Sequence, residues 1–193
     1  PALTFIEGPG PGRDGNPAGG EIGRTVARIR EGKIVALKGL GGFHLVCDPF
    51  QPGAVARLRA LKNRARKPLA LMARDAATAA GLARAGGDEL RILESAPRPI
   101  VLLAKKTEID GISPDLDTYG IMLPCTPLHF LLLQEIPVMV ATSANEREGP
   151  ILKDEGDEVA GLADCILTHN RPIANRCDDS VVKVFRGEPL FLR

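Results

Sequence analysis

The hydrophobic positions of this chain switch repeatedly between the period of a helix and the continuous runs of a buried strand. In residues 21–30, Ile22, Val26 and Ile29 fall on one helical face, and Gly32 can end the helix in a left-handed conformation. Residues 52–63 form a second amphipathic pattern. Further helices are predicted in the alanine-rich stretch between residues 72 and 99 and over 127–134 and 154–162; strands are predicted over 33–38, 69–72, 99–103, 119–123 and 138–141 and near Cys165, Val181 and Leu190.

This succession of strands and helices predicts an α/β fold, with a twisted mixed sheet flanked by helices. The chain has 193 residues, 44% of them hydrophobic, which is enough for one buried core. Glycine and proline crowd the first twenty residues, which we interpret as a linker over 1–20. We therefore predict one compact domain over residues 21–193.

Composition excludes several classes of protein. The 25 basic and 24 acidic residues leave a net charge of +1, which gives no overall field toward nucleic acid or membrane. The four cysteines form no CxxC pair and indicate reduced thiols, and no apolar stretch is long enough to span a bilayer. His44, His129 and His169 do not complete a zinc-ligand spacing. We expect a cytoplasmic protein with no membrane partner and no bound zinc.

A glycine-rich turn follows the first predicted strand, in the sequence Lys38-Gly-Leu-Gly-Gly-Phe-His44. Open α/β sheets usually bind ligands where strands end in this way. The glycines could let backbone amides approach an anion, or they could serve a tight turn at positive φ. The residues alone leave both interpretations open.

Basic residues gather at the end of the second predicted helix, at Lys62, Arg64, Arg66 and Lys67. They could be a solvated helix end, where cations complement the negative end of the helix dipole. They could also form a phosphate clamp, since lysine offers a point charge and arginine a bidentate fork.

Polar side chains follow the strand predicted over 138–141, in the sequence ATSAN. Thr142, Ser143 and Asn145 bring two hydroxyls and an amide to the expected edge of the sheet. Such residues also form plain turns by bonding their own backbone. A site and a turn both fit this segment.

A fourth polar cluster precedes the strand near Val181. It contains Arg176, two adjacent aspartates and Ser180. The carboxylates could hold Mg²⁺ or pair with the arginine.

Taken in this order, the four stretches resemble the YrdC-like family. Over residues 23–193 the chain is similar to the HypF branch of this family, the carbamoyltransferases of hydrogenase maturation. The similarity is carried by the sequences KGLGGFHLVCD, GIMLPCTPLHFLLL, ATSAN and NRPIANRCDDSVV. The family's K-x-R element matches Lys62 and Arg64, its S-x-N element matches Ser143 and Asn145, and its pre-strand serine matches Ser180.

The resemblance implies a fold with a large concave basic cavity and a reaction in which carbamate, released from carbamoyl phosphate, attacks the α-phosphate of ATP. Carbamoyl adenylate and pyrophosphate would form, with Mg²⁺ bridging phosphate oxygens. We expect Lys62 and Arg64 to lie solvent-facing on the cavity wall. By this resemblance Lys62 and Arg64 stabilise the leaving pyrophosphate, with help from Arg66 or Lys67. The adenylate oxygens are bound by Thr142, Ser143 and Asn145, and the nucleotide side is closed by Arg176 and Ser180. The carbamoyl group is faced by Lys38 and His44.

The resemblance also implies partners. A HypF protein carries an acylphosphatase domain and zinc fingers before this region and a carbamoyl-transfer domain after it. The final acceptor would be a HypE-type protein with a C-terminal cysteine, whose carbamoyl group becomes a cyanide ligand of [NiFe]-hydrogenase. The turn Lys38-Gly-Leu-Gly-Gly departs from the proline-threonine turn of relatives that use threonine, which favours a bare carbamoyl donor.

Binding of double-stranded RNA is the alternative function. Residues 57–67 hold six basic side chains, which could follow a phosphate backbone. The balanced net charge argues against it, and the absence of tryptophan and the single tyrosine leave few stacking groups for single strands. We rank adenylate formation first.

Overall fold

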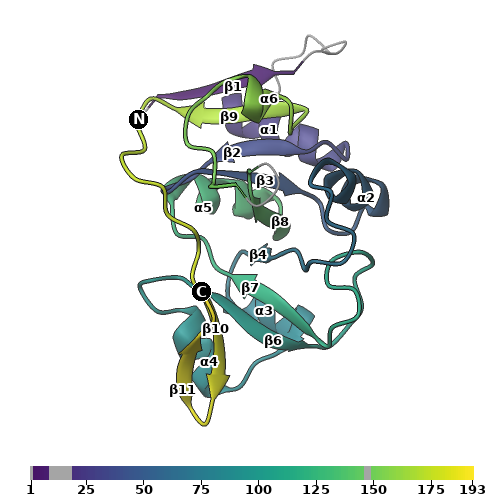
Figure 1. The fold of residues 1–193 in the computed structure, drawn as a ribbon, viewed down its shortest axis with the longest axis vertical. Coiled ribbons are helices and arrows are strands. Elements are labelled where there is room, and N and C mark those ends of the chain that lie inside the picture. Colours follow the sequence, from purple (N-terminus) through teal and green to yellow (C-terminus); the bar gives the residue numbers. More distant parts are fainter. Residues whose placement is uncertain (1, 9–18, 146–148) are drawn as a thin grey trace. The chain divides into compact units, whose positions relative to one another are not determined.

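The computed structural model describes residues 2–8, 19–145 and 149–193, which divide into two compact units (Figure 1). The first unit is Pro1–Ala65 with Ala141–Asp178, and the second is Arg66–Val140 with Asp179–Arg193. The prediction of one domain over residues 21–193 stays a prediction. The chain passes from one unit to the other after Ala65, Val140 and Asp178.

The first unit contains strands in the order β1-β9-β2-β3, with β8 beside β3. The β1–β9 and β2–β3 pairs are antiparallel, and the β2–β9 pair is parallel. Its elements are β1 (Leu3–Glu7), α1 (Gly20–Arg30), β2 (Val35–Lys38), β3 (Phe43–Cys47), α2 (Pro52–Leu61), the end of β8 (Val138–Ser143), α6 (Asp157–Ala160) and β9 (Cys165–His169).

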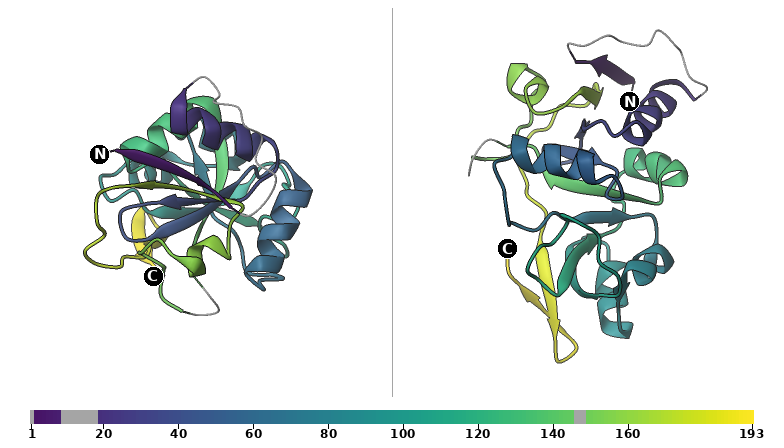
Figure 2. Two further views of the ribbon diagram at one scale, coloured as in Figure 1. Left: turned by 90° about the horizontal axis from the view of Figure 1, so that it is seen from above. Right: turned by 90° about the vertical axis from the view of Figure 1, so that its right-hand side faces the viewer.

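Helices lie on both sides of these strands, which explains their continuous apolar sequences. The right-hand view in Figure 2 shows α1 and α6 on opposite sides. Every residue of β2 and β3 is consequently buried, with no alternation of exposed positions. Helix α1 buries Val26 and Ile29 against this layer, and Gly32, at a φ of 78°, turns the chain after it as the sequence predicts.

The predicted linker over residues 1–20 is wrong for its first part. Leu3–Glu7 forms strand β1, whose register with β9 pairs Leu3 with His169 and Glu7 with Cys165. The Gly8 amide then donates to the Asp164 carbonyl at 2.8 Å. A short apolar run can join a sheet edge even when glycine and proline follow it. The remainder of the predicted linker, residues 9–18, lies outside the described residues.

The second unit contains strands in the order β8-β4-β7-β6-β10-β11, and β5 pairs with β6. The β4–β7 and β6–β10 pairs are parallel, whereas β4–β8, β6–β7 and β10–β11 are antiparallel. Its elements are β4 (Leu71–Ala73), α3 (Ala76–Leu82), β5 (Ala83–Arg84), α4 (Gly87–Leu93), β6 (Ile100–Lys105), β7 (Thr118–Met122), α5 (Pro127–Glu135), the start of β8, β10 (Val181–Phe185) and β11 (Glu188–Phe191).

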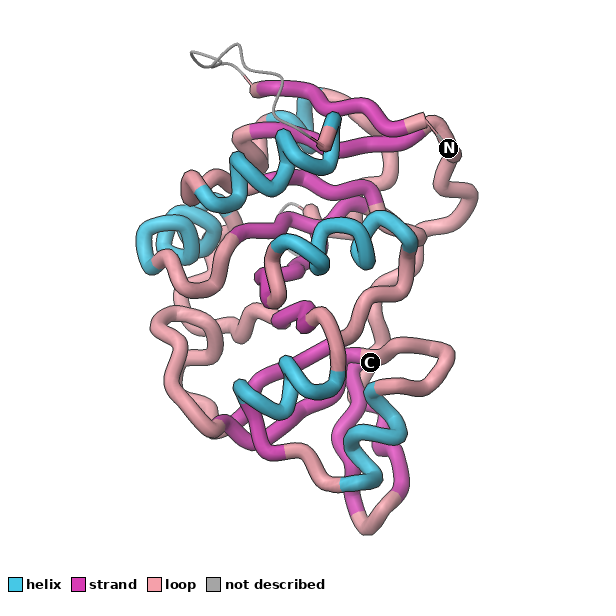
Figure 3. Tube along the Cα trace, turned by 180° about the vertical axis from the view of Figure 1, so that it is seen from behind, coloured by secondary structure: helices cyan, strands magenta, loops and turns pink. Residues whose placement is uncertain are grey.

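The predicted mixed sheet flanked by helices is confirmed. Figure 3, seen from behind, shows α3 and α4 in front of the strands of the second unit. Side-chain caps fix where two helices begin: Asp75 accepts from the Thr78 amide at 2.7 Å, and Thr126 accepts from the His129 amide at 3.2 Å. Among the described residues, no helix is long and apolar enough to cross a membrane.

All four cysteines are unpaired with one another, as the sequence predicts. Cys47 and Cys165 are buried in the first unit, and burial raises the pKa of each thiol to about 12. Both thiols therefore stay protonated and act as small apolar core groups.

One buried hydroxyl organises the loop between β6 and β7. Tyr119 is fully buried; its hydroxyl accepts from the Ile109 amide at 2.6 Å and donates to the Thr107 carbonyl at 3.0 Å. The Tyr119 hydroxyl thereby provides hydrogen-bond partners for two backbone groups of the loop.

Replacing Tyr119→Phe should lower the free energy of unfolding by about 1–3 kcal/mol, because the buried Ile109 amide loses its acceptor. Urea denaturation followed by circular dichroism measures this change. Phe185→Tyr is the matched control, since it adds a hydroxyl to a ring that is 60% exposed. Identical urea midpoints for Tyr119→Phe and the unchanged chain would show that this hydroxyl does not hold the loop.

Candidate functional site

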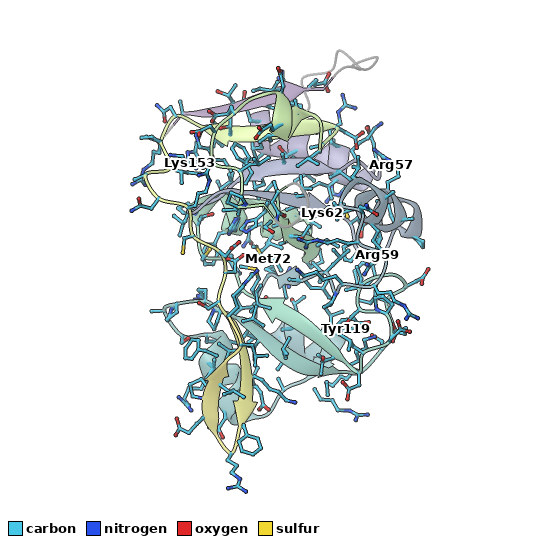
Figure 4. The ribbon with its side chains drawn as sticks, viewed as in Figure 1. Arg57, Arg59, Lys62, Met72, Tyr119 and Lys153 are labelled. Carbon is cyan, nitrogen blue, oxygen red and sulfur yellow. The ribbon has the colours of Figure 1, made fainter. Side chains whose placement is uncertain are left out.

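Lys62 lies at the C-cap of α2, and its ammonium group reaches the end of β8. It donates to the side-chain oxygen Oδ1 of Asn145 at 2.6 Å, to the Asn145 carbonyl at 3.4 Å and to the Ser143 carbonyl. Figure 4 labels Lys62 in this position. One lysine therefore joins segments that are more than 80 positions apart in the chain.

The expectation that Lys62 faces solvent is wrong. The residue is only 5% exposed, because protein oxygens take the place of water around its ammonium group. Arg64 is half-buried, and its Nη2 atom lies 3.5 Å from the same Asn145 Oδ1. Asn63, between them, adopts a positive φ of 47°, a conformation that asparagine tolerates better than most residues. The two cations of the K-x-R element thus converge on one amide oxygen.

Asn145 is the centre of this cluster. Its Oδ1 atom also accepts from the Ser143 hydroxyl at 3.2 Å, and its Nδ2 atom donates to the Gly149 carbonyl at 2.8 Å. Donors on one side and an acceptor on the other define the orientation of the amide. The structure therefore brings together Lys62, Arg64, Ser143 and Asn145, as the sequence predicts, and the neighbouring Thr142 is buried at the end of β8.

The glycine turn lets other segments of the chain pack against its backbone. Gly39, Gly41 and Gly42 all lack positive φ, so the interpretation as a left-handed turn is wrong. A Cβ atom at Gly41 would lie 2.7 Å from the Cys177 backbone nitrogen, and one at Gly42 would lie 2.6 Å from Cδ1 of Ile151. The Gly39 amide is already bonded to the Gly42 carbonyl at 2.8 Å. Glycine is required here because two other segments pack directly on the turn.

Lys38, at the end of β2, is buried and forms an ion pair with Glu155, whose side chain is 41% exposed. Its Nζ atom donates to Glu155 Oε1 at 2.7 Å and to the His169 carbonyl at 3.0 Å, and Thr168 donates to the same carboxylate. The hydrogen bonds from Lys38 and Thr168 lower the pKa of Glu155. The partners of Lys38 thus lie on β9 and before α6. His44 is buried in β3, with its ring beside Gly39.

The other predicted site residues are distributed between the units. In the first unit, Arg176 donates to the Ile151 carbonyl at 2.9 Å. In the second, Arg66 pairs with Asp115 at 3.1 Å, Lys67 is exposed, and the Ser180 carbonyl accepts from the Ile100 amide at 2.8 Å. Their predicted roles in nucleotide binding stay predictions.

Among the residues that the structure describes, no group of three or more histidine, cysteine or acidic side chains could hold a metal ion. Asp179 accepts from the Arg193 guanidinium through its backbone carbonyl.

Two residues of the candidate site were missed in the sequence. Glu155, the partner of Lys38, is 117 positions away along the chain and has no recognisable spacing to it. Arg59 donates to the carbonyls of Arg64 and Ala65 at 2.7 and 3.2 Å. Arg59 lies among the six basic residues of 57–67, but nothing in that pattern separates a residue that supports the backbone from one that contacts a ligand.

Comparison with known proteins identifies the family. A family model described as "Telomere recombination", for the Sua5, YciO and YrdC proteins, matches residues 27–193. The chain belongs to this family. It is 45% identical over 190 residues to "Carbamoyltransferase HypF2" of Cupriavidus necator, covering 87% of this chain and 23% of that protein. It is also 43% identical over 176 residues to "Carbamoyltransferase HypF" of a Synechocystis strain, covering 88% and 23%.

Solved structures agree with this membership. "Full-length HypF in the phosphate- and nucleotide-bound form" matches with a TM-score of 0.88 and 44% identity, over 100% of this chain and 25% of that one. "P. abyssi Sua5 complexed with L-threonine" matches in fold, with a TM-score of 0.77 and 24% identity, over 90% and 53%. The resemblance to the YrdC-like domain of HypF proteins is confirmed, and the chain spans about a quarter of the HypF proteins it matches.

The packing role of the family's glycine turn can be tested by Gly41→Ala. We expect a loss of about 1–3 kcal/mol in the free energy of unfolding, because the added methyl group meets the backbone of Cys177. Gly53→Ala in α2 is the matched control: a Cβ there has no neighbour within 4 Å, and alanine favours the helix by up to about 1 kcal/mol. Urea denaturation of both variants gives the comparison, and equal stabilities would remove the packing argument.

The Lys38–Glu155 pair makes stability depend on pH. The pKa of Glu155 is lowered from 4.5 in the folded chain, so the pair stabilises the fold above that pH, and the contribution is lost as the pH falls through the lowered pKa. Glu155→Gln should reduce Tm at pH 7 by roughly 1–4 °C, allowing for the solvent exposure of this carboxylate.

The difference in Tm between Glu155→Gln and the unchanged chain should shrink as the pH falls below 4.5. Scanning calorimetry between pH 7 and pH 3 measures it. The control is Glu188→Gln on exposed strand β11. A difference that stays constant over this range would contradict the ion-pair assignment.

Proposed function

We propose that the first unit binds ATP through its triphosphate and forms carbamoyl adenylate from carbamate, as the YrdC-like part of a HypF-type carbamoyltransferase. The observation that supports this most directly is the convergence of Lys62, Arg64 and the Ser143 hydroxyl on Asn145. The proposal is also supported by the name "Carbamoyltransferase HypF" of the relatives and by the HypF structure described as "phosphate- and nucleotide-bound".

Arg64 would make the principal contact with phosphate. Its guanidinium is half-buried, and its contact with Asn145 is the longest in the cluster at 3.5 Å. Exchanging a neutral amide oxygen for a phosphate oxygen converts a weak contact into a charge-assisted, bidentate one. Arg64 can therefore turn to the triphosphate without breaking the cluster.

Lys62 and Ser143 would act at the other end of the triphosphate. The ammonium of Lys62 is surrounded by the oxygens of Ser143 and Asn145, so it contributes a fixed positive charge close to the phosphates. The Ser143 hydroxyl can rotate from Asn145 to an α-phosphate oxygen. Thr142 and Asn145 complete this adenylate side.

In the proposed reaction a carbamate oxygen forms a bond to the α-phosphorus as the bond from that phosphorus to pyrophosphate breaks. One further negative charge develops on the departing pyrophosphate and must be stabilised, which is the task of Arg64, Lys62 and substrate-bound Mg²⁺. Lys38 and His44 are assigned to the carbamoyl end. Lys38 would first exchange Glu155 for the carbamate carboxylate, which preserves its ion pair.

Transfer of the carbamoyl group would require a longer protein. The matched HypF relatives are about four times the length of this chain, since it covers 23% of them. We propose that the adenylate passes to another part of such a protein and then to the cysteine thiol of a HypE-type acceptor. Shielding from water would protect the product on the way.

The proposal predicts carbamate-dependent exchange of pyrophosphate into ATP in the presence of Mg²⁺, with ammonium bicarbonate as the source of carbamate. Arg64→Ala should reduce kcat/KM for this exchange by roughly 100–1000-fold with little change in Tm, since it removes a donor to developing charge. Lys62→Ala should reduce exchange and also cost about 1–3 kcal/mol of stability, because buried oxygens lose their donor.

Arg84→Ala, at an exposed arginine of β5, is the control and should retain full exchange. Full exchange by Arg64→Ala would remove Arg64 from the site. Absence of exchange by the unchanged chain, despite ATP binding shown by calorimetry, would contradict adenylate formation by this region alone.

A further inference from the structure

A second arginine holds the loop that carries Lys62 and Arg64. Arg59 lies in the last turn of α2, and its Nη1 atom donates to the Arg64 carbonyl at 2.7 Å and to the Ala65 carbonyl at 3.2 Å. Figure 4 labels Arg59 and Lys62 at this end of the helix. The side chain of Arg59 therefore links the loop back to the helix.

The loop needs such a support because its course is unfavourable. Asn63 adopts a positive φ of 47°, and the chain reverses so that the Arg64 amide donates to the Arg59 carbonyl at 3.0 Å. Residue 59 thus contacts residue 64 in both directions, through its backbone carbonyl and its guanidinium. The Nη1 atom carries two N–H donors for the two adjacent carbonyls and lies one bond further along its side chain than a lysine ammonium would, so a lysine at this position falls short of both carbonyls.

Partial burial gives this bridge a cost. The guanidinium of Arg59 is half-buried, and desolvation lowers its pKa. A cation whose only role was to attract phosphate would gain by remaining in water. The contacts with two carbonyls instead indicate that the side chain is used to fix the backbone.

We propose that Arg59 is a positioning residue, which holds the loop so that Arg64 reaches the Asn145 amide to which Lys62 is bonded. It would act through Arg64 without contacting phosphate itself. This inference rests on the proposed function and adds a determinant of the geometry of the same site. The competing explanation is that Arg59 is one more positive charge in the basic cluster.

The consequence concerns turnover more than binding. Lys62 remains tied to Asn145 and Ser143 when the loop loosens, so much of the charge that attracts ATP stays in place. Arg64 loses its defined position, and misplacement of a transition-state contact by about 1 Å can cost roughly 100-fold in rate. Arg59→Met should therefore lower kcat for pyrophosphate exchange by roughly 10–100-fold, with KM for ATP changed by less than about threefold.

Three variants separate positioning from charge. Arg59→Met keeps the apolar stem and removes every donor, Arg59→Lys keeps the charge without the fork, and Arg84→Met is the control at an exposed arginine. The positioning role predicts that Arg59→Lys has most of the kcat defect of Arg59→Met. If Arg59→Lys exchanges pyrophosphate as fast as the unchanged chain, the positioning role is overturned, and the positive charge of Arg59 is what matters.

Hydrogen–deuterium exchange supplies a readout that does not depend on activity. Peptides covering residues 59–67 should exchange faster in Arg59→Met and Arg59→Lys, while peptides from β2 and β9 should not change. A loss of pyrophosphate exchange in these variants, without any change in the deuterium uptake of these peptides, would overturn the positioning role. If the unchanged chain shows no pyrophosphate exchange, the proposed function fails, and the deuterium measurement still decides whether Arg59 holds the loop.

Chemical rescue provides a second activity test. Arg59→Ala should regain exchange when guanidinium chloride is added at low millimolar concentration, because the free ion can bridge the same carbonyls, and sodium chloride at equal ionic strength should have no effect. Equal responses to both salts would contradict a bridging role. Should Arg59→Met fail to fold, Arg59→Lys and this rescue experiment carry the same decision.

Discussion

The candidate site depends on one buried positive charge. Moving an ammonium group out of water is costly, and the fold compensates for this by surrounding Lys62 with oxygens of Ser143 and Asn145. The same contacts fix the end of α2 to the end of β8 and orient the Asn145 amide. Stability and site geometry therefore rest on the same interaction, so a change that removes the charge also disturbs the positions of the groups around it.

A second constraint comes from how closely the segments pack around the glycine turn. Gly41 and Gly42 leave room for Cys177 and Ile151, and the Cys177 amide donates to the Gly41 carbonyl at 3.1 Å. Arg176, next to Cys177, is bonded to the Ile151 carbonyl, which ties the two overlying segments together. The turn thus places Arg176 by steric fit, and the approach of its amides to an anion stays a prediction.

Periodic helices and buried strands were predictable because their patterns are local. Helix α1 and strand β2 follow directly from apolar spacing and from Gly32. Strands β1 and β3 were missed: each is five residues long and borders glycine-rich sequence, where a short run has no period to measure. In the site, motif order grouped the Lys62 cluster correctly. The burial of Lys62 could not be predicted, since lysine is usually exposed and its partners come from a distant segment.

The three basic residues at the end of α2 have unequal partners, and this inequality suggests a division of work. Arg59 is bonded to backbone carbonyls and Lys62 to buried oxygens, so both are committed to holding structure. Arg64 has the longest contact, at 3.5 Å to an amide oxygen shared with two other donors. Under the proposed function, a phosphate oxygen would compete with Asn145 for Arg64, because a charge-assisted contact replaces the long contact with an amide oxygen. The cluster would then contain one cation that turns to the ligand and two that define where it can turn.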